Sequence, residues 1–374
     1  MKITTFHCFE EIKPFWIEFE KEAELYAFQT YDWLSHWYKS IGVFLDEKPC
    51  FVKIENDMGK PLILLPLGIR KRLGVSCLSW LGGELADYNA PILCRNVSKY
   101  ISYDQIRDLW KQIINRLSPI DAVYFDKQPE QVGDQTNPFI YLNCNDFPQS
   151  SYSINLEGDW KTFYQNIKKN IRTDSQRQRR RLAKLGVLKF IIGKDEDDIR
   201  LITNKMIEQK SRRYKETGSY NPFNKQIYQH FYHSIGKECS DSGLVHVSAL
   251  LLNDTIIATH WGLVYKGRFY YLLPTYAGEE WKRYSAGRIL LEHLFEWCFE
   301  KKINVFDFSV GDEPYKKDWC NKTMKLYEYR ESLTVKGKNY LYLPALKNWV
   351  LLHPPVHSFI KKNLSFFRGF LAKS

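Results

Sequence analysis

The segment at residues 305–316 joins an apolar run to a cluster of polar side chains. It reads VFDFSVGDEPYK and carries Asp307, Tyr315 and Lys316. The apolar part predicts a strand that ends in a loop, and ligands bind beyond such strand ends in open α/β sheets. A carboxylate there could take a proton from an amine, while a tyrosine or lysine could contact an oxyanion or an anionic acceptor. A solvated loop in which Asp307 caps a backbone group explains the pattern equally well.

A candidate phosphate-binding turn lies just before an apolar-striped segment, at residues 282–288. Small side chains at the start of a helix let backbone N–H groups approach a pyrophosphate, and the helix dipole and nearby arginines favour its charge. Ordinary capping of the helix by a serine is the alternative. The residues concerned are Arg283, Ser285, Ala286, Gly287 and Arg288.

His260 is the third candidate, within the apolar run ATHWGL at residues 258–263. A histidine in such a run is a hydrogen-bonded core residue in the simpler interpretation. Close to an amine, its neutral imidazole could instead act as a general base or orient the substrate. The eight cysteines form no C-x-x-C pair and the histidines no H-E-x-x-H motif. We therefore expect reduced thiols and no bound metal.

The elements that must position these residues occur twice along the chain. β-Branched and aromatic runs bounded by Asn, Asp and Gly predict the strands, and an apolar stripe through Leu290, Leu294 and Cys298 predicts the later helix. In the first half the pattern is strands at 51–55, 62–69 and 76–81, a helix at 102–117 and a strand at 122–125. In the second half it is strands at 244–252, 255–264 and 269–275, a helix at 286–301 and a strand at 304–309.

This internal repeat predicts an α/β (α+β) protein with two tandem domains, each a mixed, mainly antiparallel sheet flanked by helices. We place the domains at 1–150 and 151–338, followed by a basic, aromatic tail at 339–374. Residues 159–184 are expected to form one long helix with Asp159 as its N-cap and Gly186 as its stop signal. Further helices are expected at 197–214 and 224–239.

The chain has 54 Lys and Arg against 43 Asp and Glu, a net charge of +11, which favours anionic partners. The basic residues concentrate at 70–72, at 168–184 and in the tail. On a helix, 168–184 would spread its charge around the circumference with Ile171 and Leu182 as apolar anchors. Phosphate binding and simple solvation explain this run equally well.

No stretch reaches the roughly 20 apolar residues of a membrane span, and the N-terminus carries acidic residues where a signal peptide needs an apolar run. We therefore expect a cytoplasmic protein. The tail could lie on the inner face of the membrane as a peripheral contact, or pack against its own domain.

Four sequence features, in order, resemble the GNAT-type acetyltransferase domain of CelD-like proteins, which occur with polysaccharide-biosynthesis functions. They look related to the FemABX peptidyltransferases as well. The resemblance spans about residues 160–320, and the last motif is the most specific. FQTYDWLSHW at 28–37 and the Asp87-Tyr88 pair resemble the N-terminal half of such proteins more loosely. The four features are RLAKLG at 181–186, ATHWGL at 258–263, YSAG at 284–287, and FDF at 306–308 followed by GDEPYK at 311–316.

The resemblance implies two tandem GNAT-like domains, of which the second binds an acyl donor and the first is a degenerate partner. The turn at 285–288 would hold the CoA pyrophosphate, while His260, Asp307, Tyr315 and Lys316 would line the acceptor side. The implied function is an N-acyltransferase that uses acetyl-CoA or another acyl-CoA as co-substrate. Its acceptor would be a small amine, such as an amino sugar or sugar nucleotide in polysaccharide or cell-envelope biosynthesis.

Two alternatives stay open at this point. A FemABX-like enzyme would transfer an amino acid from aminoacyl-tRNA, which suits the basic run, although such enzymes typically carry a coiled-coil arm. A non-catalytic binding protein could also retain the GNAT fold, because a fold does not guarantee chemistry.

Overall fold

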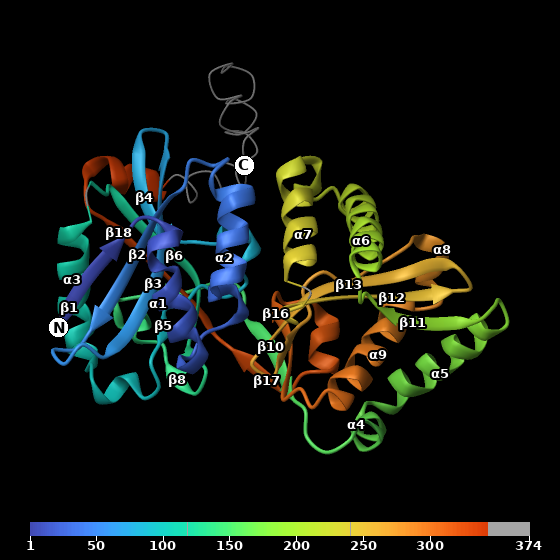
Figure 1. The fold of residues 1–374 in the computed structure, drawn as a ribbon. Coiled ribbons are helices and arrows are strands. Elements are labelled where there is room, and N and C mark those ends of the chain that lie inside the picture. Colours follow the sequence, from blue (N-terminus) through green and yellow to red (C-terminus); the bar gives the residue numbers. More distant parts are fainter. Residues whose placement is uncertain (118, 240, 343–374) are drawn as a thin grey trace, which may run out of the picture.

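The structure is a computed structural model that describes residues 1–342 apart from 118 and 240. Two eight-stranded sheets stand side by side in it (Figure 1). The first sheet has the order β1 (Lys2–Phe6), β2 (Lys48–Glu55), β3 (Pro61–Arg72), β4 (Val75–Trp80), β6 (Ala122–Pro129), β18 (Leu326–Ser332) and β9 (Asn145–Asp146), with β5 (Ile92–Leu93) pairing β3.

The second sheet repeats this arrangement. One pair in each sheet is parallel, β4 with β6 and β14 with β16, and the other pairs are antiparallel, as predicted. A separate hairpin joins β7 (Gln131–Val132) to β8 (Gln135–Thr136). The order of the second sheet is β11 (Leu188–Ile192), β12 (Val245–Leu252), β13 (Thr255–Tyr265), β14 (Arg268–Tyr270), β16 (Val305–Val310), β10 (Ser151–Asn155) and β17 (Lys322–Met324), with β15 (Thr275–Tyr276) pairing β13.

Helices cover both faces of the second sheet, with α6 and α7 on one side and α4, α5 and α9 on the other (Figure 1). In the first domain, α3 flanks its sheet and α2 faces the second domain, where it contacts α7. The helices are α1 (Phe9–Glu22), α2 (Tyr31–Trp37), α3 (Tyr103–Arg116), α4 (Trp160–Asn166), α5 (Lys169–Ala183), α6 (Glu196–Thr217), α7 (Gln226–Glu238), α8 (Glu279–Lys282) and α9 (Ala286–Glu300).

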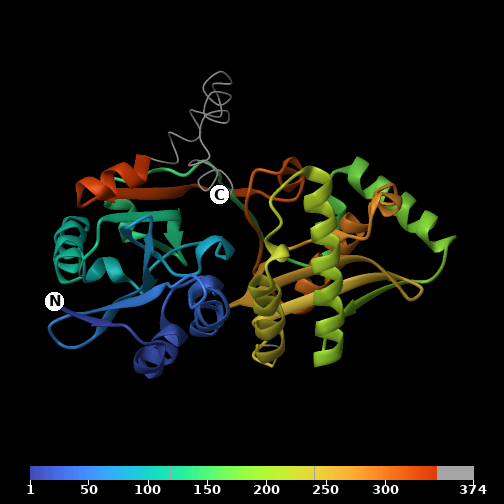
Figure 2. The same ribbon diagram turned by 90° about the horizontal axis from the view of Figure 1, so that it is seen from above.

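One strand crosses from the second half of the chain to the first sheet. β10 opens the second half and pairs with β16 in the second sheet, where Ser153 stands opposite Asp307. β18 follows the second sheet in sequence but pairs with β6, where Tyr329 stands opposite Phe125 (Figure 2). The second sheet thus begins at Ser151, next to the boundary predicted at residue 150, whereas β18 lies before residue 338 and yet belongs to the first sheet.

Two predicted elements are broken in the structure. The helix expected at 159–184 is two helices, because the backbone at Ile167 is extended between α4 and α5. Asp159 does cap the first of them, since its carboxylate accepts from the Thr162 N–H at 2.9 Å. The strand expected at 269–275 ends at Tyr270 and resumes only with β15.

Strand β18, which joins the first sheet from the second half of the chain, should stabilise the first domain. Tyr329 is buried and packs its ring against Trp110 and Phe125. We expect Tyr329→Ala to lower the free energy of unfolding by about 3 kcal/mol through the cavity it leaves. Urea denaturation followed by fluorescence and circular dichroism measures this loss. Tyr327→Ala, at a half-buried position of the same strand, is the matched control and should cost clearly less.

Candidate active site

Strands β14 and β16 diverge in the middle of the second sheet. Their parallel pairing ends where Tyr270 stands beside Asp307. The following segment, 271–276, turns toward β13, where the Leu273 N–H donates to the Trp261 carbonyl at 3.0 Å. Meanwhile β16 continues beside β10. The pairing of the two strands therefore ends at their carboxyl ends, and we call this break in the sheet the opening. Open sheets bind ligands at such strand ends.

The N-terminus of α9 lies next to the segment that leaves this opening. Ser285 has a left-handed backbone with φ of 53° and its side chain makes no capping hydrogen bond, so simple capping does not explain the turn. The N–H groups of Ala286 and Gly287 donate to no carbonyl or side chain in the described part of the chain. In the equivalent helix α3, a reciprocal capping box engages the N–H groups of Ser102 and Gln105. The start of α9 has no such capping box.

The basic helix α5 lies against α9. Two ion pairs join the helices, Arg179 with Glu292 at 2.9 Å and Arg288 with Asp174. Although desolvation opposes it, the hydrogen bond and charge of Arg288 hold the pKa of Asp174 below its ordinary value. The predicted apolar anchors do belong to the buried stripe of α5, which comprises Ile171, Ser175, Gln178 and Leu182.

The exposed arginines of α5 gather near the start of α9. The Arg181 guanidinium lies 4.8 Å from the centre of the Tyr284 ring and donates to the Arg283 carbonyl at 3.2 Å. Arg283 covers the same ring at 4.9 Å. Positive charge is therefore concentrated beside the free amides of Ala286 and Gly287, which suits a bound anion.

His260 and Asp307 are close in the sheet but lie on opposite faces. The His260 ring is fully buried on the α9 side, where it stacks on Tyr271 at 4.9 Å and Phe269 at 5.2 Å. Burial lowers its pKa well below the ordinary value, so the imidazole is neutral. Asp307 faces the first domain, whose Tyr88 hydroxyl donates to it at 2.8 Å. The two residues are not brought together as one catalytic pair.

The Asp307 carboxylate is fully engaged by its neighbours. One oxygen accepts from the Arg268 guanidinium at 2.7 Å, and the other accepts from the Tyr88 hydroxyl and from the Ser309 N–H at 2.7 Å. The Arg268 guanidinium in turn lies 5.5 Å from the centre of the Tyr26 ring. The network links β16, β14 and the first domain in the interior.

Lys316 and Tyr315 lie on the short helical turn η7 (Pro314–Asp318). The buried Lys316 ammonium donates to the carbonyls of Val310 at 3.0 Å and Gly311 at 3.1 Å, and pairs with Glu313 at 2.9 Å. It therefore closes the end of β16. Tyr315 is 40% exposed at the same strand end, so a ligand can reach its ring.

A pocket of about 210 Å³ between the domains adjoins the opening, and we call it the tyrosine pocket. The segment that leaves β14 forms part of its wall, so the pocket and the opening share residues. Tyr228 and Tyr232 are more than nine-tenths buried. Its lining residues are Glu84, Leu85, Asp87, Tyr214, Tyr220, Pro222, Phe223, Tyr228, Tyr232, Leu272 and Leu273.

Asp87 is the lining residue of the tyrosine pocket that we consider as a general base. Burial raises its pKa, while the charges of Lys127 and Lys316 oppose the rise. A carboxyl group with a raised pKa in a cleft is a candidate general base. Burial also lowers the pKa of Lys210 on α6 to about 8 against the effect of Glu313. The local sequence around these residues carries no catalytic pattern, because the pocket is assembled from both domains.

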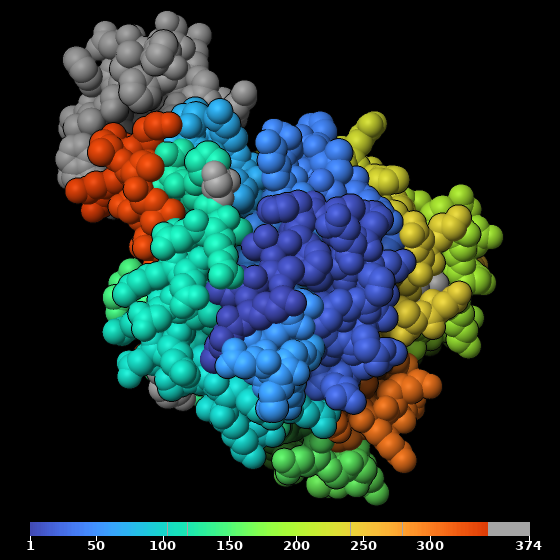
Figure 3. Space-filling view, turned by 60° about the vertical axis from the view of Figure 1, so that its left-hand side comes forward, coloured from blue at the N-terminus to red at the C-terminus, as the bar shows by residue number. Residues whose placement is uncertain are grey.

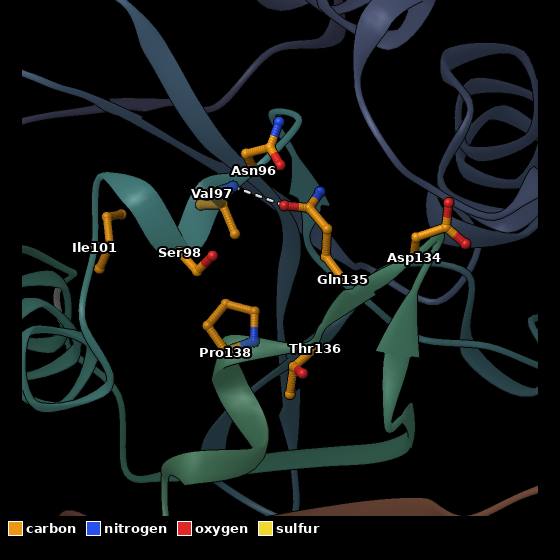
Figure 4. Close-up of a pocket in the computed structure, with 8 residues that line it drawn as sticks. All are labelled: Asn96, Val97, Ser98, Ile101, Asp134, Gln135, Thr136 and Pro138. Carbon is orange, nitrogen blue, oxygen red and sulfur yellow. Dashed lines mark hydrogen bonds between the residues drawn. The ribbon is translucent and has the colours of Figure 1, made fainter.

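A second cavity of about 230 Å³ lies on the first domain alone (Figure 4). Its main polar side chain is already occupied, because the Gln135 amide accepts from the Val97 N–H at 2.6 Å and donates to the Cys94 carbonyl at 3.0 Å. This cavity has no residue in common with the opening between β14 and β16.

Among the described residues, which are 1–342 apart from 118 and 240, no cluster of three or more His, Cys, Asp or Glu side chains could hold a metal ion. The same part of the chain has no helix with the length and apolar character needed to cross a membrane. The predicted membrane-contacting part of the tail, 348–370, lies outside the described residues.

Comparison with known proteins identifies the fold. Residues 169–317, from α5 through the opening to η7, match the family model described as an acetyltransferase (GNAT) domain. The solved structure of FemX is similar over 91% of this chain and 99% of its own, with a TM-score of 0.59 and 10% identity. The C-terminal domain (DUF2156) of a protein described as a lysylphosphatidylglycerol synthetase from Agrobacterium fabrum is similar over 91% and 97%, with a TM-score of 0.50 and 10% identity.

At these identities the solved structures show the fold alone, and no curated protein matches the sequence. The chain thus has tandem GNAT-like domains, and part of the second matches the GNAT acetyltransferase model, in agreement with the fold that the sequence motifs predicted. The finer assignment to the CelD-like type stays a prediction.

The buried histidines should make the fold sensitive to acid. Burial lowers the pKa of His246 to about 3, and that of its neighbour His260 is lowered too. The unfolded chain takes up these protons near pH ~6.5, so stability is full above that value and falls as the pH drops toward about 3. We expect His246→Phe to lose less stability than the wild type between about pH 7.5 and about pH 5 in urea titrations. Equal losses would contradict this account.

Proposed function

We propose that this chain is an acyl-CoA-dependent N-acyltransferase that acts on an amine acceptor. The observation that carries the proposal is the opening between β14 and β16 beside the uncapped start of α9. The thioester arm fits along the opening, and the pyrophosphate fits at the amides of Ala286 and Gly287 with Arg283 and Arg288 nearby. A Cβ added at Gly287 would meet the Tyr276 ring at 4.0 Å, so a small side chain fits at this position.

In this proposal the acceptor amine approaches from the tyrosine pocket. The amine nitrogen attacks the thioester carbonyl, and Asp87 takes the proton that the nitrogen loses. As the new C–N bond forms and the C–S bond breaks, the CoA thiolate leaves and recovers a proton from Asp87 or from solvent. Positioning the two reactants at the shared wall of pocket and opening supplies a large part of the rate.

The predicted acceptor-side residues have different tasks in this mechanism. Asp307 positions Arg268 and Tyr88, while Lys316 holds the end of β16 and favours the charged form of Asp87. Tyr315, exposed at the same strand end, is placed to contact the acceptor. The roles of His260 and Asp307 as base or amine-orienting groups stay predictions, which transfer assays on His260→Ala and Asp307→Asn address.

The chemistry of the tyrosine pocket favours an amino sugar as the acceptor. Aromatic faces pack against a sugar ring, tyrosine hydroxyls bind its hydroxyl groups, and the carboxylates of Glu84 and Asp87 attract its ammonium. The lining contains no lysine, arginine or histidine that could bind a phosphate inside it. A role in polysaccharide or cell-envelope biosynthesis is supported only by the resemblance to CelD-like proteins.

The donor site can be tested at Gly287. A carboxylate in the first turn stabilises a helix but repels a phosphate, so Gly287→Asp should keep or raise the melting temperature while weakening binding. We expect the Kd for acetyl-CoA, measured by calorimetry, to rise at least about tenfold, or ~1.4 kcal/mol. Gly287→Ala adds bulk without charge and is the matched control. Unchanged binding by Gly287→Asp would remove the donor assignment.

The catalytic base can be tested at Asp87. We expect Asp87→Asn to lower kcat by about 10²–10⁴-fold, the usual contribution of a general base. Because Asp87 must be deprotonated and its pKa is raised, wild-type kcat/KM should fall with decreasing pH at a higher pH than an ordinary carboxyl group gives. Glu84→Gln, in the same pocket, should change KM more than kcat. Wild-type kcat in Asp87→Asn would exclude this residue as the base.

Transfer from aminoacyl-tRNA is the second candidate function. Two observations favour it: the FemX fold covers both domains, and α5 exposes Arg177, Arg180 and Arg181 beside the start of α9. Binding of tRNA that weakens steeply with salt, without binding of acyl-CoA, would select this candidate. Binding of neither donor, measured as no thermal stabilisation at high ligand concentration, would favour the non-catalytic alternative.

A further inference from the structure

Two neighbouring loops project from one end of the first sheet. They comprise residues 43–48, which lead into β2, and residues 70–74, which form the turn from β3 to β4. Because Lys48 pairs with Ile69, the first loop must lie beside the base of this hairpin. In the space-filling view they form adjacent projections at the upper edge of the molecule (Figure 3). We call these residues the loop tip.

The loop tip exposes apolar side chains to solvent. Val43 is 60% exposed, Phe44 66% and Leu73 74%. Leu73 also has a left-handed backbone with φ of 51°, followed by Gly74 at 78°. Turns of this kind normally use Asn or Asp before Gly, because a leucine is strained there. A leucine that is strained and exposed to water does not stabilise the fold. Its position therefore indicates an apolar contact outside the chain.

Basic side chains surround these apolar residues. Lys48, Lys71 and Arg72 are exposed, and Arg70 is half-buried. The nearby acids offset little of this charge, since Glu47 is buried and paired with Arg70 at 3.5 Å and only Asp46 is exposed within the loops. Apolar side chains ringed by lysine and arginine are the pattern that binds the interface of an anionic bilayer.

The described chain also ends beside the loop tip. Tyr340 and Leu341 pack on Val75 and Cys77 at the base of the β3–β4 hairpin. The sequence that follows, at 348–370, contains Trp349 and several further aromatic and basic residues. The last described residues of the chain therefore lie beside the loop tip.

We propose that the loop tip docks on the surface of an anionic phospholipid bilayer, with the apolar side chains in the interface and the basic side chains on lipid phosphates. This docking goes beyond the proposed acyl transfer and does not depend on it. The contact uses surface residues of the first domain that lie outside the opening and do not line the tyrosine pocket.

The proposal is tested by co-sedimentation of the full chain with vesicles of phosphatidylcholine alone or with about 30% phosphatidylglycerol. We expect binding only to the anionic vesicles. The double variant Phe44→Ser, Leu73→Ser and the double variant Lys71→Glu, Arg72→Glu should each lower the partition coefficient at least about tenfold. High salt should weaken the wild type in the same direction.

The matched control is Met58→Ser, because Met58 is 88% exposed in a hairpin turn at the opposite end of β2 and β3. It should bind like the wild type, and melting curves should show all variants folded. Wild-type binding by both loop-tip variants would assign the membrane contact to another segment and overturn the proposal. Failure of the wild type to bind anionic vesicles would overturn it too and leave a protein partner as the occupant of the loop tip.

Discussion

The Asp307 carboxylate is a buried charge whose partners come from both domains. A buried charge is tolerated only when its hydrogen-bonding capacity is filled, and removing one partner of such a pair typically costs about 3–5 kcal/mol. Here Arg268 comes from the neighbouring strand, and Tyr88 comes from the first domain. This group therefore helps to hold the domains in one relative position, together with aromatic contacts between them such as Phe28 with Tyr270 and Trp33 with Phe231. The last pairing between β14 and β16 occurs at Asp307, so the buried network also fixes the residue at which the opening starts.

The same arrangement explains why the candidate site is built from both domains. Tyr88 reaches Asp307 because the segment around it enters the domain interface, and this segment also carries Asp87 into the tyrosine pocket. The second domain contributes the walls from α6, α7 and the residues that leave β14. In the proposed mechanism the first domain supplies the candidate base and the second supplies the candidate donor site, so both domains take part in the chemistry.

Much of the fold is readable from the sequence because its signals are local. The hairpin turn at Asn253 and the apolar stripe of α9 predict elements that the structure contains. The capping role of Asp159 is readable for the same reason. The break between β14 and β15 is not, because residues 271–274 remain apolar and only their pairing with β13 reveals the turn.

Long-range partners explain the remaining differences. The return of β18 to the first sheet depends on which sheet edge is free, and no local pattern encodes that. The pairing of Asp307 with Arg268 and Tyr88 likewise requires the folded interface. From the sequence alone, Asp307 is therefore interpreted equally well as a loop cap or as a catalytic group. For the tyrosine pocket, helical spacing accounts for Tyr228 and Tyr232, but the approach of Asp87 follows only from domain packing.

The late position of β18 also sets the order in which the protein can be completed during its synthesis on the ribosome. All strands of the second sheet lie between Ser151 and Met324, so this sheet can close before β18 emerges. The first sheet must wait for β18, whose last residue is Ser332. Until then the edge of β6 stays open, and an unpaired edge invites pairing with other chains. The domain that begins the polypeptide is therefore the last to finish folding.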